Sequence, residues 1–157
     1  MFKLPNEKTL LAMFRPMDRR GVEITRDVPL PMRVTDYFTW SFGRRTFLVF
    51  EAPGCAPRGI VFEADVSGVP VPHMCAWCEA VAPGTRVALM TARRDPKRVA
   101  GIMLCADLGC RERLEDRADR AGIDVAPAMT KLLSRMQRFA ESLVAESRDD
   151  PERLLDP

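Results

Sequence analysis

The sequence of 157 residues lacks any run of eighteen consecutive apolar residues and any marked excess of charge of one sign. The first absence excludes a bilayer-spanning helix, and residues 1–8 contain no apolar run of signal-peptide length. We therefore expect a cytoplasmic protein without a membrane partner. The 24 lysines and arginines nearly balance the 22 aspartates and glutamates. The chain therefore lacks the large positive net charge that is typical of a general nucleic-acid-binding protein.

Groups for acid–base chemistry are also scarce. The only histidine is His73, and Met74 follows it, whereas a zinc deaminase needs a catalytic glutamate close to its ligand histidine. The carboxylates fall mainly into helical charge patterns such as that of residues 112–119, and no pair of them suggests proton transfer. We therefore expect a protein that is not an enzyme.

Cysteines supply the clearest positive signal. Four of the five form two close pairs, Cys75-x2-Cys78 and Cys105-x4-Cys110, separated by 26 residues. In a reducing compartment such pairs favour metal binding over disulfides. Four thiolates at about 2.3 Å complete the tetrahedral shell of one Zn²⁺ ion and leave no position for water. The spacing therefore predicts one zinc ion with a structural role.

One alternative is that Cys75-Ala-Trp-Cys78 is a redox dithiol, in which a helix N-terminus lowers a thiol pKa. Pro72 precedes this motif and Pro83-Gly84 follows it, so we expect no long helix to begin there. A redox role would also leave Cys105 and Cys110 unexplained.

A second alternative concerns the identity of the ligands. His73 lies two residues before Cys75 and can in principle replace one thiolate, although four sulfurs already fill a tetrahedron. We interpret it as a loop histidine beside the site. Cys55 stands alone in a proline-rich turn, and we expect it to have no part in the site.

The remaining pattern predicts an α+β fold. Helical spacing occurs at residues 7–15, where Asn6 is the expected N-cap, at 110–122, and after Pro127. Strands are predicted at residues 22–25, 33–40, 46–51, 59–65, 86–92 and 99–105. A knuckle, a hairpin and a helix that carries the last ligand are typical of a treble-clef zinc finger, here built on a small antiparallel β-scaffold with a C-terminal amphipathic helix.

We divide the chain into three regions within one compact domain. Residues 1–66 form an N-terminal helix and β-hairpin region, residues 67–148 form the zinc-finger region with its C-terminal helix, and residues 149–157 form a tail.

The predicted hairpin turn is strongly basic, with Arg93, Arg94, Lys97 and Arg98 in six residues. Such a turn is either simply solvated or makes a contact with ribosomal RNA or with an acidic protein face. Trp77, inside the knuckle, is either an exposed aromatic anchor for a partner or a shield over the zinc sulfurs.

Three segments together resemble a known family: His73-Met-Cys-Ala-Trp-Cys78, Val87-Ala-Leu-Met-Thr-Ala-Arg-Arg94 and Gly101-Ile-Met-Leu-Cys-Ala-Asp-Leu-Gly-Cys110. The chain is similar to the C-terminal treble-clef zinc-finger domain of bacterial elongation factor G-binding proteins, which include the fusidic-acid resistance proteins. The resemblance covers residues 40–145. It implies that Cys75, Cys78, Cys105 and Cys110 bind zinc.

The same resemblance implies that the domain docks on elongation factor G and helps this factor to leave the ribosome. The resistance proteins carry a helical bundle before the finger, whereas this sequence predicts one short helix and then strands. The alternative function that remains is a zinc finger that binds ribosomal RNA or another nucleic acid through Trp77 and the basic turn.

Overall fold

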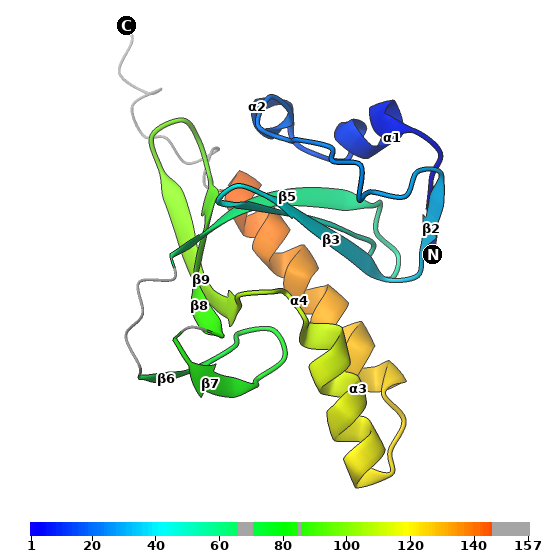
Figure 1. Ribbon diagram of the computed structural model, residues 1–157, viewed down its shortest axis with the longest axis vertical. Coiled ribbons are helices and arrows are strands. Elements are labelled where there is room, and N and C mark those ends of the chain that lie inside the picture. Colours follow the sequence, from blue (N-terminus) through cyan, green and yellow to red (C-terminus); the bar gives the residue numbers. More distant parts are fainter. Residues whose placement is uncertain (66–70, 85, 146–157) are drawn as a thin grey trace, which may run out of the picture.

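The computed structural model describes residues 1–65, 71–84 and 86–145 (Figure 1), so the predicted tail at 149–157 lies outside the described residues. Its centre is an antiparallel sheet with strand order β3-β4-β5-β8-β9. The strands are β3 (Tyr37–Phe42), β4 (Arg45–Phe50), β5 (Arg58–Asp65), β8 (Val87–Arg93) and β9 (Val99–Cys105). The pairing of β5 with β8 carries this sheet across the predicted boundary at residue 66.

Both faces of the sheet are covered. In β4, Phe47 and Val49 belong to one buried cluster, whereas Leu48 and Phe50 belong to the other. Successive side chains of a strand point to opposite faces, so the unbroken apolar sequence of β4 follows from its burial on two sides. Figure 1 shows the N-terminal elements over one face and the long C-terminal helix over the other.

The N-terminal layer consists of β1 (Phe2–Leu4), α1 (Glu7–Ala12), α2 (Pro16–Arg19) and β2 (Met32–Val34), with β1 and β2 paired antiparallel. Phe14 fastens this layer to the sheet. Its buried ring meets Trp40 and Phe47 edge-on, with centroids 6.1 and 6.5 Å away. It also lies directly on Gly59, where an added Cβ would stand 2.7 Å from the ring. Only glycine permits this close approach.

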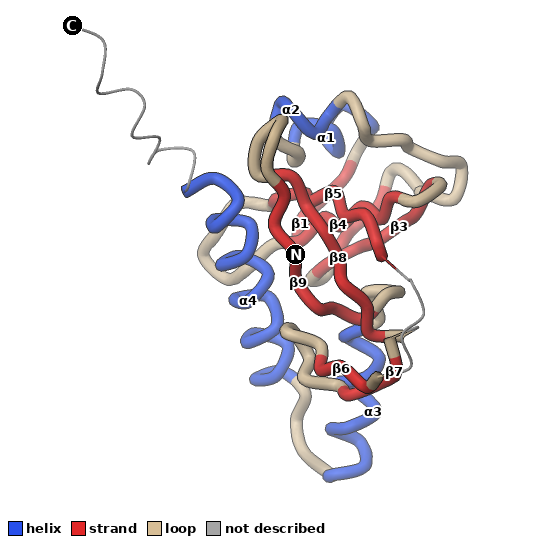
Figure 2. Tube along the Cα trace, turned by 90° about the vertical axis from the view of Figure 1, so that its left-hand side faces the viewer, coloured by secondary structure: helices blue, strands red, loops and turns tan. Residues whose placement is uncertain are grey.

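The opposite layer contains the short ribbon of β6 (Pro72–Met74) and β7 (Val81–Pro83) together with α3 (Cys110–Ala121) and α4 (Ala126–Ala145). Figure 2 shows α4 extending along the side of the sheet, and α3 beside the ribbon. Phe139 of α4 stacks on Phe62 of β5 at 5.7 Å. The residues that α4 buries recur at helical spacing: Leu132, Leu133, Met136, Ala140 and Leu143.

Most predicted elements are confirmed. The side chain of Asn6 caps α1 by accepting the N–H of Thr9 at 2.9 Å, and α3 ends at Gly122, which has a φ of +66°. The α+β class is confirmed as well. Among the described residues, no helix is both long and apolar enough to cross a membrane.

Three details predicted for the N-terminal half are wrong. Residues 22–25 form no strand. One carbonyl of this segment is instead bound by a sheet side chain, since the indole N–H of Trp40 donates to Glu23 at 2.8 Å. The single strand at 33–40 is instead two strands, β2 and β3, which belong to different sheets. The first helix, predicted to run to residue 15, ends at Ala12, and Pro16 lies instead in the first turn of α2, where proline is tolerated.

We predict that Phe14→Ala lowers the free energy of unfolding by about 3–5 kcal/mol, because it empties a site packed between Gly59 and two aromatic rings. Urea denaturation measures the change. Phe42→Ala is the control, since Phe42 is 54% exposed, and should change stability by less than about 1 kcal/mol. Equal effects of the two substitutions would contradict the role of Phe14.

Candidate metal centre

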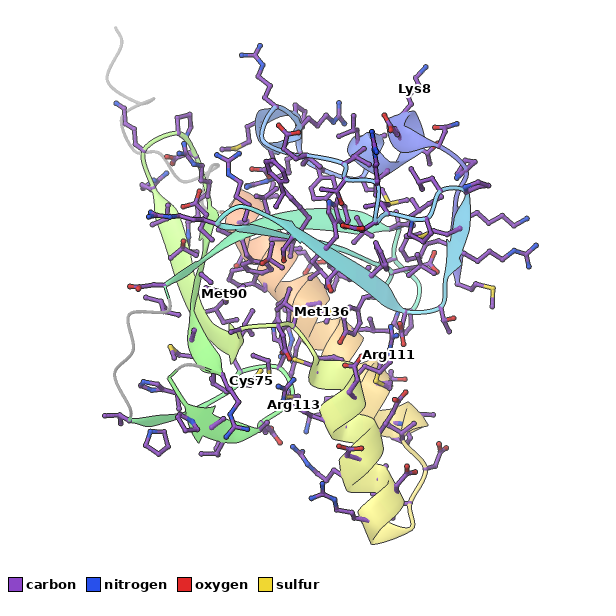
Figure 3. The ribbon with its side chains drawn as sticks, in the orientation of Figure 1. Lys8, Cys75, Met90, Arg111, Arg113 and Met136 are labelled. Carbon is purple, nitrogen blue, oxygen red and sulfur yellow. The ribbon has the colours of Figure 1, made fainter. Side chains whose placement is uncertain are left out.

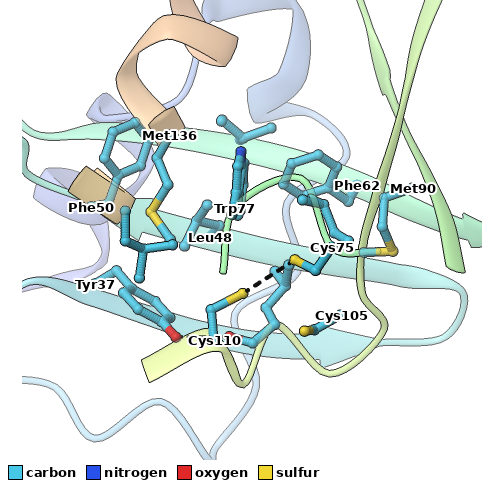
Figure 4. Packing of buried hydrophobic residues seen from close by; sticks show 14 of the residues in the cluster. Tyr37, Leu48, Phe50, Phe62, Cys75, Trp77, Met90, Cys105, Cys110 and Met136 are labelled. Atoms are coloured by element: carbon cyan, nitrogen blue, oxygen red, sulfur yellow. Dashed lines mark hydrogen bonds between the residues drawn. The ribbon is translucent and has the colours of Figure 1, made fainter. Parts of the chain in front are cut away.

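The four paired cysteines meet in one buried cluster. Their sulfur atoms all lie within 4.8 Å of one another, with 3.8 Å between Cys75 and Cys110 and 3.5 Å between Cys78 and Cys105 (Figure 4). A disulfide would need about 2.05 Å, and all four thiols are free. Each residue is at most 1% exposed.

The first pair lies in a knuckle between β6 and β7. The N–H of Cys75 donates to Ala80 at 2.8 Å, and the N–H of Glu79 donates back to Cys75 at 2.9 Å. Glu79 closes this turn with a φ of +63°, which is uncommon for a residue other than glycine. The N–H of Ala76 donates to Met103 at 2.8 Å, which attaches the knuckle to β9. No helix begins at the pair, so the redox alternative lacks its activating element.

The second pair comes from the end of a strand and the start of a helix. Cys105 is the last residue of β9 and Cys110 is the first residue of α3. The turn between them closes when Leu108, with a φ of +51°, donates its N–H to Cys105 at 2.9 Å. A helix N-terminus presents unpaired N–H groups and a positive dipole end, both of which favour a thiolate.

This geometry fits a zinc ion. A regular tetrahedron with Zn–S bonds of about 2.3 Å has sulfur–sulfur edges of about 3.8 Å, close to the two distances given above. Four sulfur donors are also the set that a structural zinc site uses. His73 lies on β6 opposite Ala82. Among the described residues, the group that can bind a metal consists of the four cysteines and includes neither His73 nor Cys55.

The four buried thiols also influence one another through hydrogen bonds, which separate their pKa values. Hydrogen bonding with Cys105, and then with Cys110, lowers the pKa of Cys75. Hydrogen bonding with Cys105, and then with Cys75, raises the pKa of Cys110. Four thiolates this close together in a buried cluster would repel one another strongly. A divalent ion lets all four thiols lose their protons, and the complex then carries a net charge of −2.

Three arginines, two from α3 and one from α4, bind the turns that carry this negative charge. Arg117 donates to the carbonyl of Cys78 at 3.1 Å, and Arg135 donates to the carbonyl of Trp77 and to the carboxylate of Glu79, each at 2.7 Å. The hydrogen bond to Asp107, and then the charges of Cys105 and Asp107, raise the pKa of Arg113. Figure 3 labels Arg113, which extends from the first turns of α3.

Tyr37, the only tyrosine, connects the centre to the sheet. Its hydroxyl donates to the carbonyl of Leu108 at 2.8 Å and accepts the N–H of Arg111 at 3.0 Å. Burial raises the pKa of Tyr37, so the phenol stays neutral and fills both roles. The guanidinium of Arg111 lies 4.7 Å from the ring centroid and pairs with Asp36. Tyr37 is not among the residues predicted from sequence for this site, because its partners are more than seventy residues away.

Trp77 is not an exposed anchor, so its assignment as a partner contact is wrong. The residue is 2% exposed and its ring meets Phe62 and Phe139 at 5.8 and 6.3 Å. Figure 4 shows the indole among the buried side chains beside the sulfurs. Its alternative role, as a shield of the cluster, agrees with this position.

The predicted basic residues do share one turn, between β8 and β9. Arg93, Lys97 and Arg98 are exposed and Arg94 is half-buried. Arg98 pairs with Asp95 at 2.6 Å. The turn lies apart from the cysteine cluster, because Cys105 is at the opposite end of β9, where it pairs with Val87 at the start of β8.

We predict that Cys105→Ala abolishes stoichiometric zinc binding and lowers the melting temperature, because binding free energy at such a site is also folding free energy. Zinc content and calorimetric unfolding measure both effects. Cys55→Ala is the matched control and should leave the zinc content unchanged. A Cys105→Ala protein that kept its zinc and its melting temperature would contradict the four-sulfur site.

A comparison with protein families agrees with this centre. Residues 12–146 match the FBP C-terminal treble-clef zinc-finger family. No match was found among curated protein sequences. A solved structure of the fusidic acid resistance protein FusC has 17% sequence identity and a TM-score of 0.47, over 78% of this chain and 58% of that one, so the chain spans less than two thirds of that protein. Because the family match includes all four clustered cysteines, which fit one structural zinc ion, the chain belongs to the FBP C-terminal treble-clef zinc-finger family.

Proposed function

We propose that this protein is a zinc-structured binding module that docks on elongation factor G and promotes its release from the ribosome. Membership of the treble-clef family over residues 12–146 carries the proposal, together with the resemblance of its motifs to the elongation factor G-binding proteins. Cys75, Cys78, Cys105 and Cys110 are the proposed zinc ligands. A shell of four thiolates has no open position for substrate, which supports a binding role and not a catalytic one.

In this proposal the zinc ion supplies rigidity. The knuckle, the end of β9 and the start of α3 each contribute ligands, so their relative positions are fixed when the ion is bound. A rigid surface loses little conformational entropy on docking. If it binds the released form of the factor more tightly than the ribosome-bound form, the difference in affinity shifts the population toward release without a covalent step.

The basic turn of residues 93–98 is the proposed contact with the partner. Hydrogen bonds from neighbouring side chains hold its backbone in place. The carboxylate of Asp95 accepts the N–H groups of Lys97 and Arg98, each at 2.8 Å. The guanidinium of Arg15 donates to the carbonyls of Arg93 and Arg94 and to that of Leu143 in α4. The turn thus presents cations on a fixed backbone, as electrostatic contact with an acidic protein face requires.

The second candidate is binding of ribosomal RNA, which the exposed Arg93, Lys97 and Arg98 favour. The dependence of affinity on salt distinguishes the two functions. Contacts with several phosphates release counterions and make the affinity fall steeply with salt concentration.

We predict that Lys97→Gln weakens binding to elongation factor G by about twofold to fivefold, as expected for one exposed charge contact. Isothermal titration calorimetry with the purified factor measures it. Lys8→Gln is the matched control, since Lys8 is an exposed lysine on α1. No binding of the unmodified protein at micromolar concentrations would contradict the proposed partner. Tight binding of ribosomal RNA with a steep salt dependence would favour the second candidate.

A further inference from the structure

A cavity of about 420 Å³ opens on the face of the sheet opposite to the cysteines. Its floor includes Val61, Glu63 and Thr91, of which Glu63 and Thr91 are direct neighbours across β5 and β8. The adjacent residues Phe62 and Met90 belong to the cysteine-side cluster, so the floor faces the other way. Arg45 of β4, α2 with the turn after it (Met17, Asp18, Arg20) and the β8–β9 hairpin (Arg93, Pro96, Val99) complete the lining.

The cavity lies where the N-terminal layer leaves part of the sheet uncovered. Figure 1 shows α2 on one side and the tip of the β8–β9 hairpin on the other, with the sheet below them. The guanidinium of Arg15 fixes this spacing. It pairs with Asp18 at 2.7 Å and donates to the carbonyls of Arg93 and Arg94. The walls are therefore connected by a half-buried side chain and are held at a set separation.

The lining carries more positive than available negative charge. Arg20, Arg45 and Arg93 contribute guanidinium groups. Of the two carboxylates, Asp18 is already paired with Arg15, and Glu63 lies 3.5 Å from Arg45. For the side chains of Arg20 and Arg93 we find no ion pair in the part of the chain that the structure describes. The cavity thus offers two guanidinium groups to a ligand with negative charge.

Apolar side chains border these cations. Met17 is 39% exposed and Val99 is 63% exposed, and Val61 and Pro96 extend the apolar surface into the cavity. A ligand that only carried charge would leave this surface in water. A ligand with an apolar side chain next to a carboxylate would cover it and gain from its burial.

We propose that this cavity binds a short acidic segment of a partner protein, in which aspartate or glutamate alternates with aliphatic residues. The carboxylates would meet Arg20 and Arg93, and the aliphatic side chains would cover Met17 and Val99. A nucleic acid fits less well, because its regularly spaced phosphates would meet the carboxylate of Glu63 and an apolar wall. The cavity and the zinc centre lie on opposite faces of the sheet. The cavity shares Arg93 with the basic turn, but Met17 and Arg20 lie outside that turn, so occupancy of the cavity is tested separately from the proposed binding of elongation factor G.

The test uses three probes on the full zinc-loaded chain: the peptide acetyl-Leu-Asp-Leu-Glu-amide, its uncharged analogue acetyl-Leu-Asn-Leu-Gln-amide, and the oligonucleotide rU4. NMR titration follows the methyl groups of Met17, Thr91 and Val99. We expect the acidic peptide to shift these signals in a saturable way. Arg20→Gln should weaken its binding about fivefold, whereas Arg33→Gln, an exposed arginine on β2 outside the cavity, should leave it unchanged.

A steric variant makes the test independent of charge. Thr91→Phe places a strand-compatible ring in the floor and should abolish binding, while unchanged signals from α3 and α4 would confirm that the fold is retained. Equal binding of the uncharged peptide, binding of rU4 alone, or full affinity in Arg20→Gln would each overturn the proposal. None of these outcomes bears on the elongation factor G titration, which is tested through Lys97.

Discussion

Four buried sulfur atoms from three separate backbone segments form one cluster. The elements that cover this face of the sheet pack around the cluster. The knuckle supplies Cys75 and Cys78, the end of β9 supplies Cys105, and the start of α3 supplies Cys110. Four thiolates without a cation would repel one another in a medium that solvates charge poorly. A single zinc ion converts this repulsion into a covalent-like cross-link. The knuckle, the sheet and α3 are then held in one orientation.

The charge of that cross-link explains the side chains around it. Arg117 and Arg135 bind knuckle carbonyls, Arg113 binds Asp107, and Tyr37 joins Leu108 to the backbone of Arg111. These contacts satisfy backbone groups of the turns that carry the ligands, and the arginines offset the negative charge of the sulfurs. Because Arg135 belongs to α4 and Tyr37 to β3, the contacts also connect the metal centre to the long helix and to the sheet. The surface available to a partner is therefore fixed by the ion even at a distance from it.

The zinc centre was predictable because its signal is local in sequence. Each cysteine pair lies within a single turn, and the cap residues Asn6 and Gly122 mark helix ends in the same local way. Trp77 and Tyr37 were not predictable, because their positions depend on elements far along the chain: Trp77 packs against Phe139, and Tyr37 binds the turn before α3. The segment at 22–25 has the composition of a strand but forms none, and the indole of Trp40 binds its carbonyl at Glu23. Local preference alone did not decide its structure.

A closed shell of four sulfurs around a single structural zinc ion can be measured by X-ray absorption spectroscopy at the zinc edge of the purified protein. We expect a first shell of four sulfur atoms at about 2.3 Å, with no nitrogen or oxygen neighbour. A nitrogen or oxygen ligand in that shell, from His73 or from water, would rule out the closed site, since it would mean an incomplete sulfur shell and a position open to chemistry.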